Sequence, residues 1–300
     1  MALWVPITIA AAFVQAVRFS LQKRLKGAGL STGGATMSRF LFAAPLAMLV
    51  TLGVMVATGS GLPRLGGDFW PFAIAGGLAQ IVATFCTVAL FSERNFAVGI
   101  AFTKTETVQV ALVSGVVLGD HVSATGFIAI LIGLAGVLIL SRPPRRADGG
   151  RGSVVNRASG LGLLAGALFA VAALGYRGAT LAVESPDPLL RAALSLACVT
   201  VFQSLAMGAW LAWREPGELA RMVRGWRRTA PVGVLGMLGS LGWFTAFTLQ
   251  NAAYVRCLGQ VELVFVLLIS ALAFREKITR SELAGIALLM VGIVMIVAQS

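Results

Sequence analysis

Runs of about twenty apolar residues recur along the whole chain, and charged or turn-forming residues bound each run. A helix needs roughly 20 apolar residues to cross about 30 Å of hydrocarbon. The sequence therefore predicts an all-α integral membrane protein with ten transmembrane helices and no extramembrane domain. The ten predicted spans are residues 4–22, 36–57, 70–91, 96–118, 122–141, 159–183, 188–213, 230–250, 253–274 and 281–299.

The basic residues are distributed as the positive-inside rule requires. The net charge of +12 could indicate a nucleic-acid-binding protein, but the Lys and Arg residues alternate with the apolar runs and form no stripe with aromatic residues. Loops after the odd-numbered spans hold 17 Lys and Arg residues, whereas loops after the even-numbered spans hold only Arg64. We therefore expect a multi-pass protein of the cell (inner) membrane, surrounded by a lipid bilayer, with both termini outside and no nucleic-acid partner.

The two halves of the chain resemble each other. A shift of 156 residues superimposes polar residues and tryptophans as well as apolar ones, which chance pairing of apolar helices does not explain. The sequence predicts two five-helix units, residues 1–141 and 159–300, joined by a basic cytoplasmic linker at 142–158. Because five is odd, the second unit enters the membrane in the opposite sense, and such inverted repeats place a binding site between them. The matched pairs include Trp70 with Trp226, Asn95 with Asn251, Glu106 with Glu262, Ser114 with Ser270 and Asp120 with Glu276.

The end of each unit carries a family resemblance. The segment GVVLGDHVSATGFIAILIGLAGVLIL and its counterpart ALAFREKITRSELAGIALLMVGIVMIV each have an acidic residue at a hairpin turn and a glycine in the last helix. These residues are Asp120 and Gly136 in the first segment, and Glu276 and Gly292 in the second. Both segments resemble the closing hairpin of EamA-type domains in the drug/metabolite transporter superfamily. Two such domains in tandem make the usual ten-helix exporter of that family.

The resemblance implies a cargo as well as a fold. Within the superfamily the chain is most similar to the YddG-type aromatic amino acid exporter branch, because a glutamate lies mid-helix in both units. Family members often carry a proline just after these glutamates, where this chain has Thr107 and Leu263. The resemblance thus implies export of amino acids, while this departure leaves the subfamily open.

Three charged residues fall near the middle of predicted spans. Lys104, Glu106 and Glu262 lie nine to eleven residues into their helices, too deep for their side chains to reach the headgroups. Two hypotheses remain open. In the first, Lys104 and Glu262 form a buried ion pair that holds the halves together. In the second, the glutamates bind the amino group of a substrate or carry coupling protons, and Lys104 binds a carboxylate.

Other polar residues complete the predicted substrate site. Gln109 shares a helical face with Glu106, and Gln260 matches Lys104 across the repeat. Several arginines lie within about two turns of a span end, and we expect these side chains to extend towards the headgroups. They are Arg18, Arg39, Arg177, Arg191 and Arg256. The predicted substrate-binding residues are Glu106, Glu262, Lys104, Gln109, Gln260, Gln80, Thr84, Gln15 and Trp243.

A secondary exporter of amino acids or related amphipathic metabolites, working by alternating access, accounts best for these features. The alternative is a membrane-embedded enzyme acting on lipid or a lipid-linked substrate. The single histidine, His121, and the separated Cys86, Cys198 and Cys257 give no metal-ligand or catalytic spacing. No P-loop pattern occurs. We therefore expect a monomer that is not an enzyme, with no cofactor or metal, a small-molecule substrate and protons as a candidate coupling ion.

Overall fold

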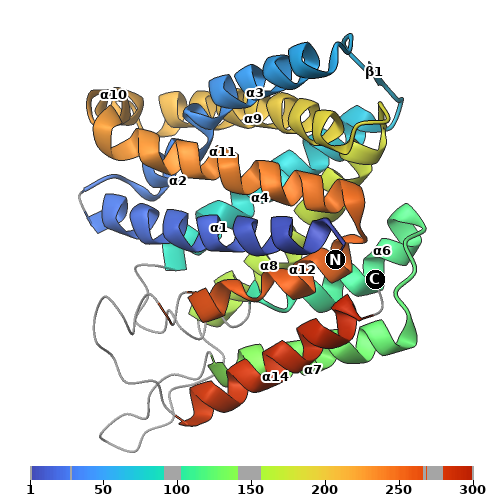
Figure 1. Cartoon of the computed structure of the whole chain (residues 1–300). Helices are drawn as coiled ribbons and strands as arrows, with labels where there is room; N and C mark the ends of the chain where they lie inside the picture. Colours follow the sequence, from blue (N-terminus) through green and yellow to red (C-terminus); the bar gives the residue numbers. More distant parts are fainter. Residues whose placement is uncertain are drawn as a thin grey trace, which may run out of the picture.

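The computed structural model describes residues 2–27, 29–90, 103–140, 157–265, 268 and 280–298. These ranges form a bundle of helices lying side by side, with a short strand pair at one end (Figure 1). The helices are α1 (Trp4–Gly27), α2 (Thr32–Leu41), α3 (Ala43–Thr58), α4 (Phe69–Leu90), α6 (Glu106–Leu118), α7 (Ala124–Leu140), α8 (Arg157–Leu181), α9 (Pro188–Arg214), α10 (Glu218–Arg224), α11 (Trp226–Leu249), α12 (Ala252–Gly259) and α14 (Arg280–Val297).

Six helical segments in the described ranges are long and apolar enough to cross a membrane. Three shorter apolar helices accompany them: Glu106–Leu118, Ala124–Ile139 and Leu283–Val297. The start of the predicted fourth span, most of the second half of the ninth and nearly all of the predicted linker lie outside the described residues. The six long segments are Trp4–Gln22, Thr32–Thr58, Phe69–Leu90, Arg157–Leu181, Pro188–Arg214 and Trp226–Leu249.

The sequence sets several helix ends through local chemistry. The side chain of Asp187 caps α9 by accepting a hydrogen bond from Leu189 N, and Pro188 occupies the first turn, where it costs no hydrogen bond. The α3 helix ends at Gly59 and α6 at Gly119, with φ of +63° and +68°. Glycine adopts this left-handed conformation without the steric penalty of a Cβ atom.

One feature departs from an all-α fold. Strand β1 (Arg64–Leu65) pairs antiparallel with β2 (Val183–Glu184), so that Arg64 lies opposite Glu184. The pair joins the loop after α3 to the loop after α8, at the end of the bundle where Figure 1 also places both chain termini and the turn between α6 and α7. Short two-residue strands leave almost no periodic signal, which explains why the sequence did not indicate them.

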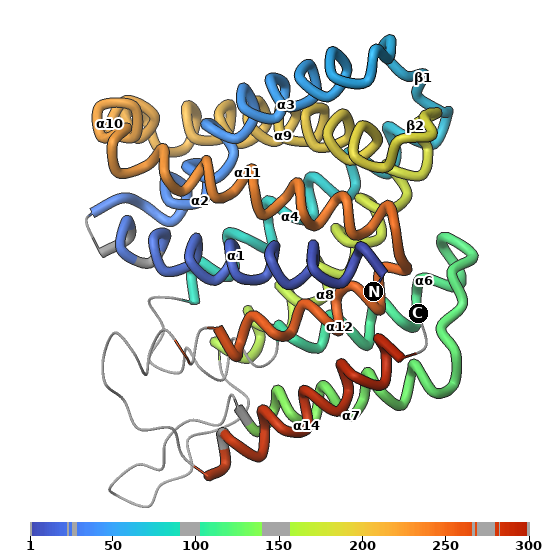
Figure 2. Tube along the Cα trace, viewed as in Figure 1, coloured from blue at the N-terminus to red at the C-terminus, as the bar shows by residue number. Residues whose placement is uncertain are grey.

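Four helix pairs dominate the packing, and each joins the first half of the chain to the second. They are α1 with α11, α4 with α8, α3 with α9 and α7 with α14, and Figure 2 lets the reader follow the α7–α14 pair at the edge of the bundle. Glycines permit the close approach: a Cβ atom on Gly136 would lie 2.6 Å from Leu289 N, and one on Gly292 would lie 2.7 Å from Ala129 O. Small residues at such crossings are typical of helices that associate in lipid.

Polar and apolar side chains are distributed in the reverse of a soluble protein. Large apolar residues face outwards, including Val56 at 82% exposure and Val116 at 88%. Arg18, Arg39 and Glu262, in contrast, are at most 5% exposed. Water would not solvate that outer surface, whereas lipid chains would, and the interior charges then need partners within the protein.

Candidate functional site

The two mid-span glutamates lie at breaks in their helices. A turn at residues 104–105 precedes α6, which begins at Glu106, and a turn at 260–261 follows α12 before the chain becomes helical again at Glu262. Around the second turn the backbone hydrogen bonds shorten to three residues, as from Leu263 N to Gln260 O at 3.0 Å. The prediction of unbroken helices missed both turns. Tightened turns inside a helix often mark a functional hinge.

Glu262 is the centre of a network that joins four of the predicted site residues. Its Oε2 accepts a 2.7 Å hydrogen bond from Gln15 Nε2 and lies 3.5 Å from Lys104 Nζ. Gln15 Oε1 in turn accepts a hydrogen bond from Trp243 Nε1 at 3.0 Å. The network thus brings together α1, α11 and the turns before α6 and after α12. It contains the Lys104–Glu262 ion pair that one of the two hypotheses required.

Glu106 forms an ion pair with Arg256 and not with Lys104. Its Oε2 lies 3.7 Å from Arg256 Nη2, and the Arg256 guanidinium lies 5.0 Å from the centre of the Trp243 ring and 5.6 Å from that of Phe247. Arginine over an aromatic face is attracted to the ring electrons. Both carboxylates lie in the interior, and each is paired with a cation from the other half of the chain.

The two turns are also joined directly. Gln260 Nε2 donates a hydrogen bond to Thr107 Oγ1 at 2.5 Å and lies 3.4 Å from the Lys104 carbonyl oxygen. Gln260 is thereby brought into the cluster, as the sequence predicted. Gln109 is not, because its side chain donates to Thr105 Oγ1, in the turn just before its own helix, at 3.1 Å.

Gln80 and Thr84, on α4, belong to a neighbouring polar cluster. Gln80 Oε1 accepts hydrogen bonds from the Tyr176 hydroxyl at 2.7 Å and from Gln203 Nε2 at 3.0 Å. Thr84 Oγ1 accepts one from Arg39 Nη1 at 3.2 Å. The Tyr176 ring stacks on Phe244, with centroids 4.3 Å apart, and Phe244 follows Trp243 in the chain. The two clusters therefore meet along α11.

Sequence reasoning missed the three arginines of the interior. Arg18, Arg39 and Arg256 were expected to extend to the headgroups, but they are only 2%, 4% and 9% exposed and make their contacts inside the bundle. For Arg18 a signal was available, because α1 continues to Gly27. Arg18 is consequently about two and a half turns from the helix end, beyond easy reach of the headgroups.

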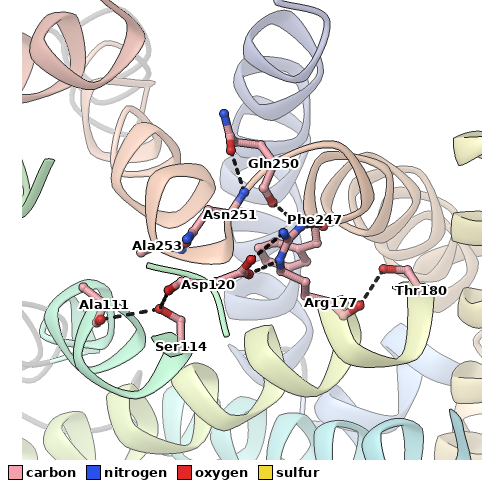
Figure 3. A network of polar contacts seen from close by, with 9 residues as sticks. All are labelled: Ala111, Ser114, Asp120, Arg177, Thr180, Phe247, Gln250, Asn251 and Ala253. Carbon is pink, nitrogen blue, oxygen red and sulfur yellow. Dashed lines mark hydrogen bonds and ion pairs between the residues drawn. The ribbon is translucent and has the colours of Figure 1, made fainter. Parts of the chain in front are cut away.

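Arg177 contacts several groups through its guanidinium (Figure 3). One of them lies in the turn between α6 and α7, at the end of the bundle where Figure 1 also places the termini. The Arg177 guanidinium donates to both carboxylate oxygens of Asp120, which lies in this turn. It also donates to the carbonyl oxygens of Phe247 at 2.5 Å and Gln250 at 2.7 Å, at the end of α11. Ser114 Oγ lies 3.2 Å from the Asp120 carbonyl oxygen and holds the turn in place. The Arg177 side chain therefore joins three elements at one end of the bundle. The sequence had instead led us to expect that it would extend to the headgroups.

Metal chemistry has no evident site in these ranges. Within the part of the chain that the structure describes, no group of three or more His, Cys, Asp or Glu side chains is placed to hold a metal ion. The interior clusters instead offer hydrogen-bond donors, acceptors and aromatic faces. Such a mixture suits the binding and orientation of a small polar molecule.

An apolar outer surface, six membrane-length helical segments and buried charges define a multi-pass integral membrane protein. Residues 158–298 match the family model described as "EamA-like transporter family". The chain therefore contains a domain of the EamA-like transporter family and is related to membrane transporters of the drug/metabolite superfamily.

A solved structure titled "Crystal structure of protein" has the same fold. It is 16% identical in sequence, with a TM-score of 0.69, and the match covers 99% of this chain and 96% of that one. At this identity the likeness establishes the fold alone. No curated protein matches the chain.

Proposed function

We propose that this protein is a secondary transporter that moves a small amphipathic solute, such as an amino acid, across the membrane by alternating access. One observation carries the proposal. Both glutamates lie at a break in their helices, and each is paired with a cation from the other half of the chain. Transporters with inverted repeats commonly bind their substrate at broken helices between the repeats.

The helix packing supports two inverted five-helix repeats, residues 1–141 and 159–300, joined by the linker 142–158. A shift of 156 residues carries α1 onto α8 and α4 onto α11, so the α1–α11 pair becomes the α8–α4 pair. The α3–α9 and α7–α14 pairs are carried onto themselves in the same way. Exchange of contacts of this kind is the pattern that a two-fold axis produces.

The distribution of charge supports an orientation in which both termini face outside. The start of α1 and the end of α14 lie at one end of the bundle, and α10 lies at the opposite end (Figure 1). The positive-inside rule assigns the α10 end to the cytoplasm. Around α10 stand five arginines: Arg214, Arg221, Arg224, Arg227 and Arg228.

The contact between Arg177 and Asp120 supports alternating access. It joins the α6–α7 turn of the first half to α8 and α11 of the second, at the end that we assign to the outside. The two side chains are 12% and 18% exposed, so the pair lies partly in contact with the surroundings of the bundle and can open without leaving either charge fully buried. We propose that the protein closes its outer end through Arg177 and opens it by breaking this contact.

The proposed binding region is the cluster around Glu262, with the neighbouring cluster on α4 beside it. In this proposal the glutamates also carry coupling protons, and a pH gradient drives transport. The binding region comprises Gln15, Lys104, Glu106, Trp243, Gln260 and Glu262, with Gln80 and Thr84 adjacent.

Counterflow in proteoliposomes tests the proposal. Vesicles containing the purified protein are loaded with unlabelled phenylalanine, tryptophan or leucine, and uptake of the same labelled amino acid is followed, with and without an imposed pH gradient. We expect saturable counterflow that falls at least about tenfold in Glu262→Gln. Glu184→Gln, an exposed acidic residue in β2, is the matched control and should behave as the native protein. Absence of counterflow for all three amino acids would refute amino acid transport, and an unchanged rate and pH dependence in Glu106→Gln and Glu262→Gln would refute their role.

A further inference from the structure

Two interior arginines lack an acidic partner. Arg39 donates hydrogen bonds to the hydroxyls of Thr84 at 3.2 Å and Ser240 at 3.3 Å, and Arg18 donates to the side-chain amide of Gln22 at 2.6 Å. Among the residues that the structure describes, no carboxylate lies within ion-pair distance of either guanidinium. Their partners are therefore neutral, although both side chains are almost fully buried, at 2% and 4% exposure.

The side chains of the two arginines pass close to the same glycine of α11. A Cβ atom on Gly236 of α11 would lie 3.1 Å from Arg39 Cγ and 3.8 Å from Arg18 Cδ. Both side chains therefore run past the same position of α11 inside the bundle. Bringing two like charges together in an apolar bundle is unfavourable, and it is stable only if an opposite charge or ordered water is present.

The other interior charges do not supply that opposite charge. Lys104 is paired with Glu262, and Arg256 is paired with Glu106. The carboxylate contacts of Glu262 are Gln15 and Lys104. The cluster thus holds two positive charges more than it holds negative ones.

Guanidinium groups suit a bound oxyanion. Each guanidinium has five N–H donors in a fork that matches a carboxylate or phosphate, and it can bind such an anion through two parallel hydrogen bonds. The bonds from Arg39 to Thr84 and Ser240, at 3.2 and 3.3 Å, are longer than the roughly 2.7–2.9 Å that is typical of a guanidinium bound to an oxyanion. Ser240, which Arg39 contacts, is one turn from Trp243 on α11, and Gln15, which accepts from Trp243 Nε1, is one turn from Arg18 on α1. The indole ring is therefore about one helical turn from each arginine position.

We propose that the solute is an organic anion whose carboxylate or phosphate binds between Arg18 and Arg39 at Gly236, with its apolar part towards Trp243. This assignment rests on the transport function proposed above, and it narrows the substrate class to molecules with net negative charge. A zwitterionic amino acid has no net charge, because its ammonium group cancels the negative charge that its carboxylate would bring to the cluster.

A series of matched solutes tests the proposal on the unaltered protein. Phenyl phosphate, 3-phenylpropionate, phenylalanine and phenethylamine share one ring and differ in charge. Their dissociation constants for the purified full chain in detergent are measured by calorimetry, with inorganic phosphate as a fifth probe. We expect at least one of the two organic anions to bind about tenfold or more tightly than phenylalanine, and phenethylamine to bind weakest. Phenyl phosphate binding tighter than 3-phenylpropionate would assign a phosphate, and the reverse order a carboxylate. Equal binding across the series, or tightest binding of phenethylamine, would overturn the proposal.

Arginine variants give a second, independent readout. Arg18→Gln and Arg39→Gln should each weaken binding of the preferred anion about tenfold while leaving phenethylamine binding unchanged or stronger, and Arg39→Lys should restore part of the loss. Arg227→Gln, an exposed position on the same helix as Gly236, is the control for net charge and should bind as the native protein does. Anion binding that is unchanged in both glutamine variants would overturn the proposal. If a variant fails to fold, the charge series on the native protein still decides.

Counterflow separates this inference from the transport function. Saturable counterflow of phenylalanine or phenethylamine, with no preference for the anions, would support the transport function and refute the anion site. Tight, arginine-dependent anion binding without counterflow of any solute would support the anion site and refute the transport function.

Discussion

Lys104 and Glu262 are 158 residues apart in the chain, and their side chains meet at 3.5 Å inside the helix bundle. Lys104 lies in the first turn, just before α6, and Glu262 begins the helical segment after the second turn. The pair therefore bridges the two places where the backbone is irregular, and its free energy bears on both the stability and the mobility of the site.

The first prediction concerns the coupling of this pair. Glu262→Gln should lower the free energy of unfolding by about 3–5 kcal/mol, because it leaves Lys104 buried without its counter-ion. Adding Lys104→Met to Glu262→Gln should recover much of that loss, since no unpaired charge remains. Chemical unfolding of the four proteins of this double-mutant cycle in detergent gives the coupling free energy, which we expect to be about 1–3 kcal/mol. Additivity of the two single changes would show that the ion pair contributes nothing.

The second prediction concerns Gly259, the last residue of α12. A Cβ atom there would lie 2.4 Å from Trp243 Cη2, so Gly259→Ala must displace the indole ring that donates to Gln15. We expect a loss of about 1–3 kcal/mol in the free energy of unfolding and reduced transport. Gly160→Ala is the matched control, because a Cβ atom at that position in α8 meets open space. It should stabilise the helix by roughly 0.5–1 kcal/mol. Equal melting temperatures for the two alanine variants would contradict the packing around Trp243.

The third prediction concerns the closure by Arg177. Asp120→Asn removes the charge that Arg177 binds, and we expect the outer end of the bundle to open more often. Ala246 is fully buried beside this network, so the labelling rate of Ala246→Cys by an impermeant maleimide reports opening. Cys86, Cys198 and Cys257 are first replaced by alanine.

The labelling rate should rise about tenfold in Asp120→Asn, which corresponds to about 1.4 kcal/mol. Asp68→Asn, an exposed acidic residue just before α4, should leave the rate unchanged. A labelling rate that is the same in Asp120→Asn and in the parent protein would rule out the closure.

The fourth prediction concerns orientation. Because the arginines around α10 mark the cytoplasmic end, epitope tags on both termini should react with antibody added outside intact cells, whereas a tag inserted at Gly217 should react only after permeabilisation. A terminal tag that is reached only after permeabilisation would reverse the proposed topology.

The helices α9 and α6 show which parts of the fold the sequence predicted correctly and which it did not. The predicted span 188–213 agrees with α9 (Pro188–Arg214) almost to the residue, because an aspartate cap and a proline fix its start. The span 96–118 was predicted as one helix, yet the chain turns at 104–105. No proline or glycine marks that turn, and the contacts that accompany it come from Gln260 in the other half of the chain.

The sequence by itself determined that this is a membrane protein with helices of bilayer length, because the thickness of the hydrocarbon acts on each segment separately. It also identified Lys104, Glu106 and Glu262 as interior charges, since the cost of a charge in lipid depends on depth along one helix. Only the tertiary structure decided that Lys104 binds Glu262, that Arg256 binds Glu106, and that Arg18 and Arg39 are left with neutral partners. Helices in lipid lack a hydrophobic force between them that would select neighbours. The partners of each charge are therefore fixed by packing between residues far apart in the chain, which no local pattern records.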